Sequence, residues 1–158
     1  MSTSAFNRLI FVLSLVGLLI AAYLWKMHAT PSLIPCVKGG GCATVAASPW
    51  SQFPKGTGPP VAAWGTLGYL ALAGLSFLRT LPSRLRFTPI FRALVIAGAL
   101  FGTLASLGLT WLELFVIKAI CAWCMGSQGL IVVILVVSIV DTVLGRRPVS
   151  AQSREVGS

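Results

Sequence analysis

Four apolar segments, each long enough to cross a lipid bilayer, constrain this chain more than any other feature of its sequence. A membrane-spanning helix needs roughly 20 apolar residues, and such segments lie at residues 9–26, 60–78, 93–112 and 119–140. Only 9% of the residues are charged, whereas a typical soluble domain has about 25%. These features predict an all-α integral membrane protein whose four transmembrane helices form a single bundle.

The polar stretches divide the chain around this membrane domain, residues 9–140. Residues 1–8 are expected to be a short cytoplasmic N-terminus, and residues 141–158 a polar cytoplasmic tail. The segment 27–59 is long for a connection in a compact protein, and such loops are more often functional than passive. Within it, residues 44–53 combine aromatic and small side chains, which favours a short amphipathic segment. We therefore expect this first outside loop to form a cap over the bundle.

The positive charge is distributed as expected for membrane topology. Of the 12 basic residues, all the arginines fall in regions that four crossings place on one side, and all the lysines fall on the other. The arginines are Arg8, Arg79, Arg84, Arg86, Arg92, Arg146, Arg147 and Arg154, and the lysines are Lys26, Lys38, Lys55 and Lys118. The positive-inside rule makes the arginine side cytoplasmic. The net charge of +9 thus indicates contact with lipid headgroups, and no nucleic acid is expected because no aromatic–basic platform accompanies it.

The cysteines form two pairs, Cys36-x5-Cys42 in the first outside loop and Cys121-x2-Cys124 at the start of the last helix. The predicted topology puts both pairs outside, where thiols meet oxidising conditions. Cys121 and Cys124 share one helix face, and a helix N-terminus favours the thiolate. Because a thiolate is the nucleophile of disulfide exchange, this pair can exchange disulfides at the surface while an apolar two-electron acceptor meets it from the membrane. A quinone is the obvious acceptor.

The loop pair has two interpretations. Gly39, Gly40 and Gly41 lie between Cys36 and Cys42, and glycines make a segment flexible. A mobile pair could carry electrons from an external protein to the CxxC motif. The alternative is a static disulfide across a glycine turn. The neighbouring CxxC motif favours the relay.

A metal site is the other chemistry open to four cysteines, because thiolates bind zinc or copper(I). His28 is the only histidine and Glu113 the only acidic residue near the outer cysteines. His28 is better explained as a residue at the headgroup level. No metal is therefore expected. The apolar runs 9–25, 60–78, 93–112 and 119–140 also contain no Lys, Arg, Asp, Glu or His for a buried proton relay or ion pathway.

The order of the motifs resembles the vitamin K epoxide reductase family, in particular its bacterial type. The resemblance covers about residues 8–140, without a fused thioredoxin-like domain. It rests on the succession Cys-x5-Cys, Ser48-x-Trp50-Ser51-x-Phe53, Gly58-Pro59-Pro60-Val61-Ala62-x-x-Gly65-x-x-Gly68-Tyr69, and CxxC at a helix start.

This resemblance implies a quinone-linked thiol–disulfide oxidoreductase that supports disulfide bond formation. Its acceptor would be a quinone of the ubiquinone, menaquinone or phylloquinone type, held within the four-helix bundle. Cys36 and Cys42 would take electrons from a thioredoxin-fold, DsbA-like partner, and Cys42 would then attack Cys121. Cys124 would face the quinone. The other implied site residues are Ser48, near the active site, and the candidate quinone contacts Gln128, Val61, Trp50 and Phe53.

Several alternatives remain open. Reduction of vitamin K epoxide itself would use Asn and Tyr side chains against the quinone carbonyls, where this chain offers Gln128 and Val61. A DsbB-like thiol oxidase carries its two cysteine pairs in the opposite order. Ser48 could simply cap the aromatic segment, and a metal-binding membrane protein is the most distant possibility. The expected location is a bacterial inner membrane with the site facing the periplasm, or the endoplasmic reticulum membrane in a eukaryote.

Overall fold

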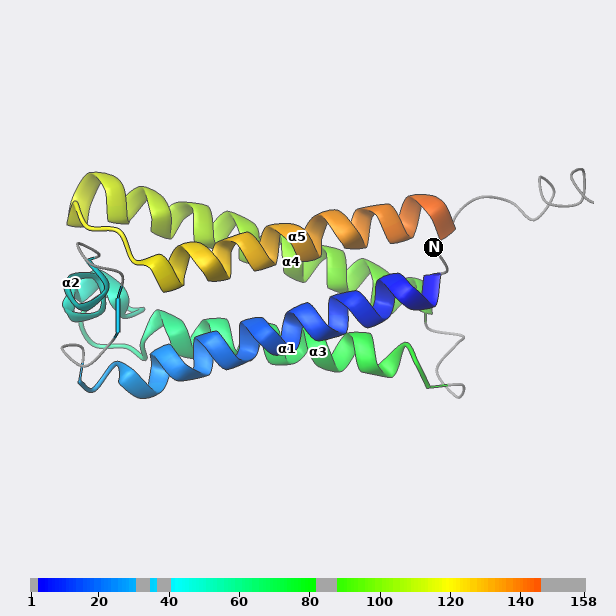
Figure 1. Ribbon diagram of the computed structural model, residues 1–158, viewed down its shortest axis with the longest axis horizontal. Coiled ribbons are helices and arrows are strands. Elements are labelled where there is room, and N and C mark those ends of the chain that lie inside the picture. The colour runs from blue at the N-terminus through cyan, green and yellow to red at the C-terminus, as the bar shows by residue number, and fades with distance from the viewer. Residues whose placement is uncertain (1–2, 31–34, 37–40, 82–87, 146–158) are drawn as a thin grey trace, which may run out of the picture.

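Four long helices make up most of the protein (Figure 1). The computed structural model describes residues 3–30, 35–36, 41–81 and 88–145. The long helices are α1 (Thr3–Met27), α3 (Val61–Leu78), α4 (Thr88–Leu112) and α5 (Ala122–Gly145). Each is long and apolar enough to cross a membrane, and the chain reverses direction from each long helix to the next (Figure 1). The predicted four-helix bundle is confirmed.

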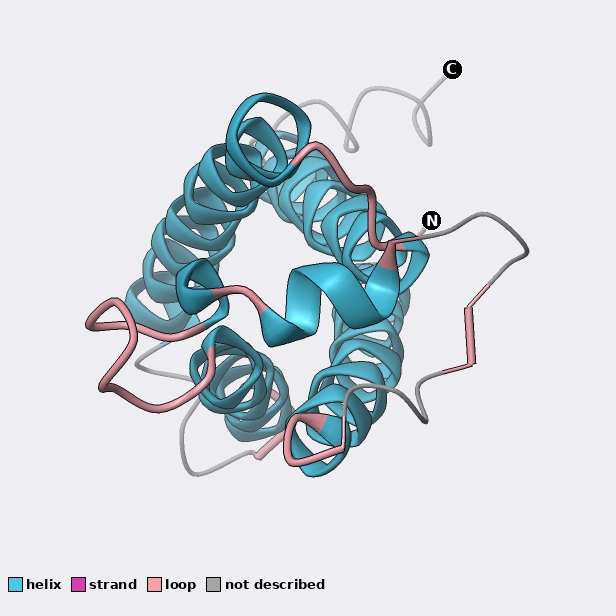
Figure 2. Cartoon of the chain, turned by 90° about the vertical axis from the view of Figure 1, so that its left-hand side faces the viewer, coloured by secondary structure: helices cyan, strands magenta, loops and turns pink. Residues whose placement is uncertain are grey.

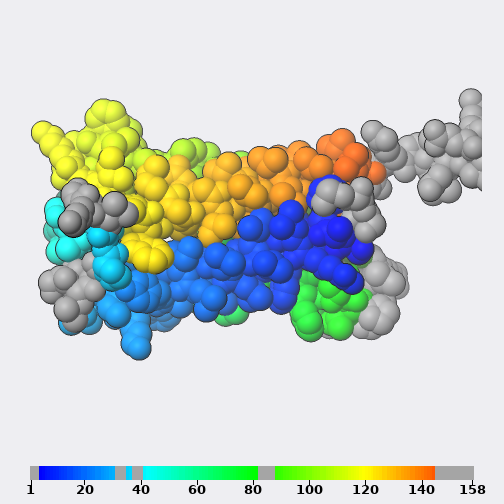
Figure 3. Space-filling view, viewed as in Figure 1, coloured from blue at the N-terminus to red at the C-terminus, as the bar shows by residue number. Residues whose placement is uncertain are grey.

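The outer surface of the bundle is strongly apolar. Leu19 is 70% exposed and Phe101 is 75% exposed. A continuous surface of this kind would drive aggregation in water but is matched by lipid chains. Inside, residues such as Ile10, Val95 and Ile134 form a buried core between the helices, and the space-filling view shows α1 packed along α5 (Figure 3). The protein is therefore a multi-pass membrane protein.

A buried charged cluster ties the helices together at the end where α1 begins. The Arg79 guanidinium donates to the Asp141 carboxylate at 2.6 Å, and Arg92 Nε lies 3.4 Å from the same carboxylate oxygen. Arg92 and Asp141 are helical because α4 begins at Thr88 and α5 continues to Gly145, beyond the apolar segments. The cluster links the end of α3 to α4 and α5.

A cap closes the opposite end of the bundle. The short helix α2 (Cys42–Ala47) and the 3₁₀ turn η2 (Pro49–Ser51) lie across this end when it is viewed along the helices (Figure 2). The chain after η2 is held at the edge by a hydrogen bond from the Phe53 amide to the Pro59 carbonyl at 3.0 Å. Part of the first loop therefore forms the cap that the sequence predicts.

The connection between α4 and α5 is a tight reversal. A single π-helical turn, η4 (Glu113–Ile117), follows α4. Lys118 then adopts the left-handed conformation, with φ at 55°, and the Ala119 amide donates to the Glu113 carbonyl at 3.0 Å. This geometry folds the chain back so that the segment before α5 lies against the end of α4.

Some expectations fall outside the described residues. They concern the flexibility of Gly39 and Gly40, the cytoplasmic placement of Arg84 and Arg86, and the polar tail from residue 146 onward.

Candidate active site

The loop cysteines are joined. Cys36 and Cys42 form a disulfide whose Cα atoms are 6.0 Å apart, a separation that a disulfide bridges without distortion. Cys42 opens α2 and is only 1% exposed, whereas Cys36 is half-buried. An external thiol thus has readier access to the Cys36 sulfur.

The CxxC cysteines are free thiols at the start of α5. Cys121 is buried, and the Cys124 amide donates to its sulfur at 3.4 Å. The hydrogen bond from the Cys124 side chain lowers the pKa of Cys121 to about 7, and the amides of Cys124 and Trp123 add to this, against burial and the nearby Glu113 charge, which raise it. These hydrogen bonds favour the thiolate form of Cys121.

A close backbone approach brings the two pairs together. The Gly41 amide donates to the Ile120 carbonyl at 2.9 Å, and a Cβ atom at Gly41 would lie 2.5 Å from the Ala119 Cβ. Glycine is what permits this contact between the cap and the segment before α5. As a result, Cys42 and Cys121 belong to one buried cluster, which allows exchange between the pairs.

Trp123 contacts the part of the first loop that carries Cys36. Its indole N–H donates to the Pro35 carbonyl at 2.8 Å, and its ring packs on Tyr23 of α1, with centroids 5.6 Å apart. The middle of the CxxC motif therefore helps to dock the loop.

Glu113 supplies a carboxyl group to the site, and it was not among the site residues predicted from the sequence. It is 4% exposed. Its carboxylate accepts a hydrogen bond from the Cys121 amide at 3.0 Å and lies within hydrogen-bonding range of the Cys124 thiol. A signal for it was present, since Glu113 is the only acidic residue near the outer cysteines. Its position in η4 puts an ionisable group at the end of an apolar span.

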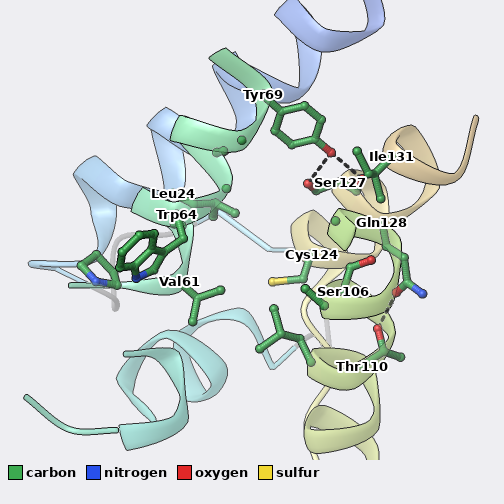
Figure 4. A pocket seen from close by; sticks show the side chains of 18 of the residues that line it. Leu24, Val61, Trp64, Tyr69, Ser106, Thr110, Cys124, Ser127, Gln128 and Ile131 are labelled. Carbon is green, nitrogen blue, oxygen red and sulfur yellow. Dashed lines mark hydrogen bonds between the residues drawn. The ribbon is translucent and has the colours of Figure 1, made fainter. Parts of the chain in front are cut away.

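An apolar cavity of about 610 Å³ opens beside the CxxC motif, between α3, α4 and α5. The Cys124 side chain points into it (Figure 4). Hydrogen-bonded pairs are among the polar groups in its otherwise apolar walls. Thr110 donates to the Gln128 side-chain oxygen, and the Tyr69 hydroxyl donates to the Ser127 carbonyl at 2.7 Å (Figure 4). The volume suits one small-molecule ring system.

The remaining predicted site residues divide into two groups. Val61 and Trp50 line the cavity with Gln128 and Cys124. Phe53 is 67% exposed and stands outside the cavity wall. Ser48 also stands outside it, where its hydroxyl accepts a hydrogen bond from the Trp50 amide at 3.3 Å and caps η2.

Over the residues that the structure describes, no three His, Cys, Asp or Glu side chains gather closely enough to hold a metal ion. His28 instead contacts Gln52, with its Nε2 atom 3.2 Å from the Gln52 side-chain nitrogen.

A membrane-embedded dithiol that faces an apolar cavity, with a second cysteine pair docked against it, defines a membrane thiol–disulfide oxidoreductase. The sequence pattern of the vitamin K epoxide reductase family matches residues 8–139. The chain belongs to that family, and it is accordingly a quinone-dependent thiol–disulfide oxidoreductase. No curated protein matches the sequence.

Proposed function

We propose that this protein oxidises the dithiol of a thioredoxin-fold partner and passes the electrons through both cysteine pairs to a membrane quinone. The observation that carries this proposal is the Gly41–Ile120 contact, which docks the loop disulfide against the CxxC motif. The reaction would supply disulfide bonds to proteins outside the cytoplasm. The thiols of the partner are the electron donor, and the quinone is the acceptor.

The relay begins at the more accessible sulfur. A partner thiolate attacks Cys36, which forms a mixed disulfide and releases Cys42 as a thiolate. The second partner thiol attacks the partner's own sulfur in this mixed disulfide, so the partner leaves oxidised and the loop pair is reduced. Cys42 then attacks Cys121 of an oxidised CxxC pair, and Cys124 is released. Attack by Cys36 on Cys42 frees Cys121, which leaves the CxxC pair reduced and the loop disulfide restored.

The cavity has the shape and chemistry to hold a quinone ring. A bound quinone accepts two electrons and two protons. Cys124 presents its sulfur to the cavity, while Gln128 supplies an amide that can hydrogen-bond a carbonyl oxygen. Val61 and Trp50 supply apolar contact surface. Phe53 would approach a quinone only if the chain around η2 moved inward.

We further propose that the cap faces the periplasm of a bacterium. The arginine distribution supports this orientation, since Arg79 and Arg92 are at the end of the bundle away from the cap. A reporter that is active only in the periplasm, fused after Arg147, should be silent. An active reporter there would reverse the orientation and remove the basis for an oxidising site.

The decisive experiment compares two electron donors. The purified protein is given an anaerobic quinone with either a small dithiol or a reduced thioredoxin-fold protein. Cys36→Ser/Cys42→Ser should lose turnover with the protein donor but keep it with the small dithiol, which can enter and reduce the CxxC pair directly. Cys124→Ser should be inactive with both donors.

Two outcomes would contradict the proposal. Equal loss with both donors in Cys36→Ser/Cys42→Ser would make the loop disulfide structural. Turnover of vitamin K epoxide faster than that of quinones, in a parallel assay, would favour epoxide reduction as the reaction.

A further inference from the structure

The Glu113 carboxylate occupies the junction of the CxxC pair and the cavity. It lines the cavity together with Cys121 and Cys124, and it contacts both residues through the Cys121 amide and the Cys124 thiol. Among the described residues, ion pairs involve Asp141 at the far end of the bundle and not Glu113. Within the part of the chain that the structure describes, the carboxylate therefore has no basic partner that would fix its charge.

The ionisable groups around Glu113 come from few elements. Cys121 and Cys124 belong to the start of α5. His28, in the turn after α1, and Tyr69 of α3 line the same cavity. The short helix α2 packs against η4 and contributes only Cys42, which is in the disulfide. The last turn of α4 contributes no ionisable side chain. Lys118 follows η4 directly but forms no ion pair with Glu113. Of the proton donors that the structure describes, the CxxC thiols are thus the ones in contact with the carboxylate.

The chemistry needs a proton carrier at this position. When the CxxC dithiol reduces a quinone, the two sulfurs become joined by a disulfide bond and give up two electrons and two protons. The hydroquinone product gains both electrons and both protons. The Cys121 proton can be lost to water at the outer boundary, and the hydroquinone can take up one proton from water as it leaves the cavity. The Cys124 proton starts inside an apolar cavity, where water is a poor carrier.

We propose that Glu113 is a catalytic proton carrier that takes the proton of the Cys124 thiol and delivers it to an oxygen of the bound quinone. This inference rests on the proposed function. Removal of the proton makes the Cys124 sulfur nucleophilic as it reacts. The Cys124 sulfur bonds to the quinone ring, and the Cys121 thiolate then attacks the Cys124 sulfur and breaks this sulfur–ring bond. The electron pair of the broken bond passes to the quinone, which becomes the hydroquinone, and the disulfide is complete. The Glu113 carboxylate returns to its charged form when it gives its proton to the quinone oxygen. General acid–base catalysis of this kind contributes about 10²–10⁴-fold to a rate.

A purely structural role makes a different prediction. The hydrogen bond from the Cys121 amide to Glu113 holds the entry of α5, because a helix N-terminus has unpaired amides. The amide oxygen of glutamine can accept the same hydrogen bond but cannot carry the proton. Glu113→Gln therefore keeps the structural contact and removes the proposed chemistry, while Glu113→Asp keeps a carboxylate at shorter reach.

The first readout uses no quinone. The full-length protein with Cys36→Ser/Cys42→Ser is reduced, and alkylation of Cys121 by iodoacetamide is followed against pH by peptide mass spectrometry. The charge of Glu113 raises the pKa of Cys121 against the dominant hydrogen bond from Cys124, which lowers it. Glu113→Gln should move the alkylation midpoint to lower pH, by about one unit. An unchanged midpoint would show that the carboxylate carries no charge beside the pair, and the proposal would fail.

The second readout is single-turnover reduction of quinone by the prereduced protein. Glu113→Gln should slow it by about 100-fold, even though its Cys121 thiolate is more abundant, and Glu113→Asp should be faster than Glu113→Gln. A rate for Glu113→Gln within threefold of the parent would overturn the proposal. If Glu113→Gln does not fold, the rate of Glu113→Asp tests the proposal instead. A parent-like rate of Glu113→Asp supports a carboxylate carrier, and a 100-fold loss refutes it.

The two readouts also distinguish a failure of the proposed electron pathway from a failure of the proposed role of Glu113. If the parent protein itself reduces no quinone, the donor-to-quinone pathway is wrong. The alkylation midpoint still reports whether Glu113 is charged beside the thiols.

Discussion

Substitution of Gly41 by alanine should selectively disable transfer from the loop pair to the CxxC pair. Gly41 has φ −87° and ψ 25°, a backbone conformation open to alanine, so the substitution acts through contact and not through backbone strain. The new Cβ would lie 2.5 Å from the Ala119 Cβ and 3.1 Å from its Cα. Carbon atoms pack best at about 3.5–4.0 Å, so the cap must shift by about 1 Å.

The cost of this shift sets the expected effect. Overpacking typically costs about 1–3 kcal/mol, and about 1.4 kcal/mol corresponds to tenfold in an equilibrium. The docked state of the loop should become about 5- to 150-fold less populated. Turnover with a protein donor should fall at least fivefold, while turnover with a small dithiol stays within threefold of the parent.

The assay is quinone reduction with each donor in turn, and Gly108→Ala is the matched control. Gly108 is an exposed glycine of α4, and a Cβ there meets nothing within 4 Å, so both activities should be unchanged. Parent-like turnover of Gly41→Ala with the protein donor would show that transfer does not depend on the Gly41 contact. Equal loss with both donors would show that the substitution damages the CxxC site itself.

Three further predictions concern the cysteines and the buried charges. Cys124→Ser should accumulate a disulfide between Cys42 and Cys121 under mild oxidation, which requires Cα atoms within about 7 Å, and a non-reduced digest without the linked peptides would refute the relay. Because the pKa of Cys121 is lowered to about 7, its alkylation should be fast above pH 7 and be lost below it, and a midpoint near the ordinary value of about 8.5 would contradict this. Asp141→Asn leaves the buried Arg79 without its carboxylate and should cost about 3–5 kcal/mol, and an unchanged melting temperature in detergent would refute that role.

The helices were predictable because a long apolar segment has few other ways to satisfy its backbone in lipid. Their ends were less predictable. The third apolar segment predicts a helix from residue 93, yet α4 begins at Thr88, because Pro89 is tolerated in a first helical turn. The extension carries Arg92 into the helix, where a carboxylate from α5 meets it. Arg92 and Asp141 are far apart in the sequence, so no short sequence pattern indicates that their side chains meet.

The cysteine chemistry was predictable from spacing, but the position of Glu113 was not. The CxxC pattern by itself places two sulfurs on one helix face. The position of Glu113 depends on a π-helical turn and on a left-handed lysine, and neither conformation has a strong sequence signature. Phe53, in contrast, was predicted to contact the quinone but lies outside the cavity. Its aromatic side chain suggests a contact with the quinone, whereas the hydrogen bond from its amide to Pro59 holds it at the exposed edge of the cap.

The reversal between α4 and α5 fixes the number of residues that must separate Glu113 from the CxxC motif. The carboxylate of Glu113 meets the amide of a residue eight positions later, and the π-helical turn sets that span. One residue added or removed within a helical turn rotates everything beyond it by about 100°, which would swing the carboxylate away from the thiols. The spacing Glu-x7-Cys-x2-Cys is therefore a sequence motif. Other membrane protein sequences can be searched with this motif for CxxC pairs that have a carboxylate at the same position.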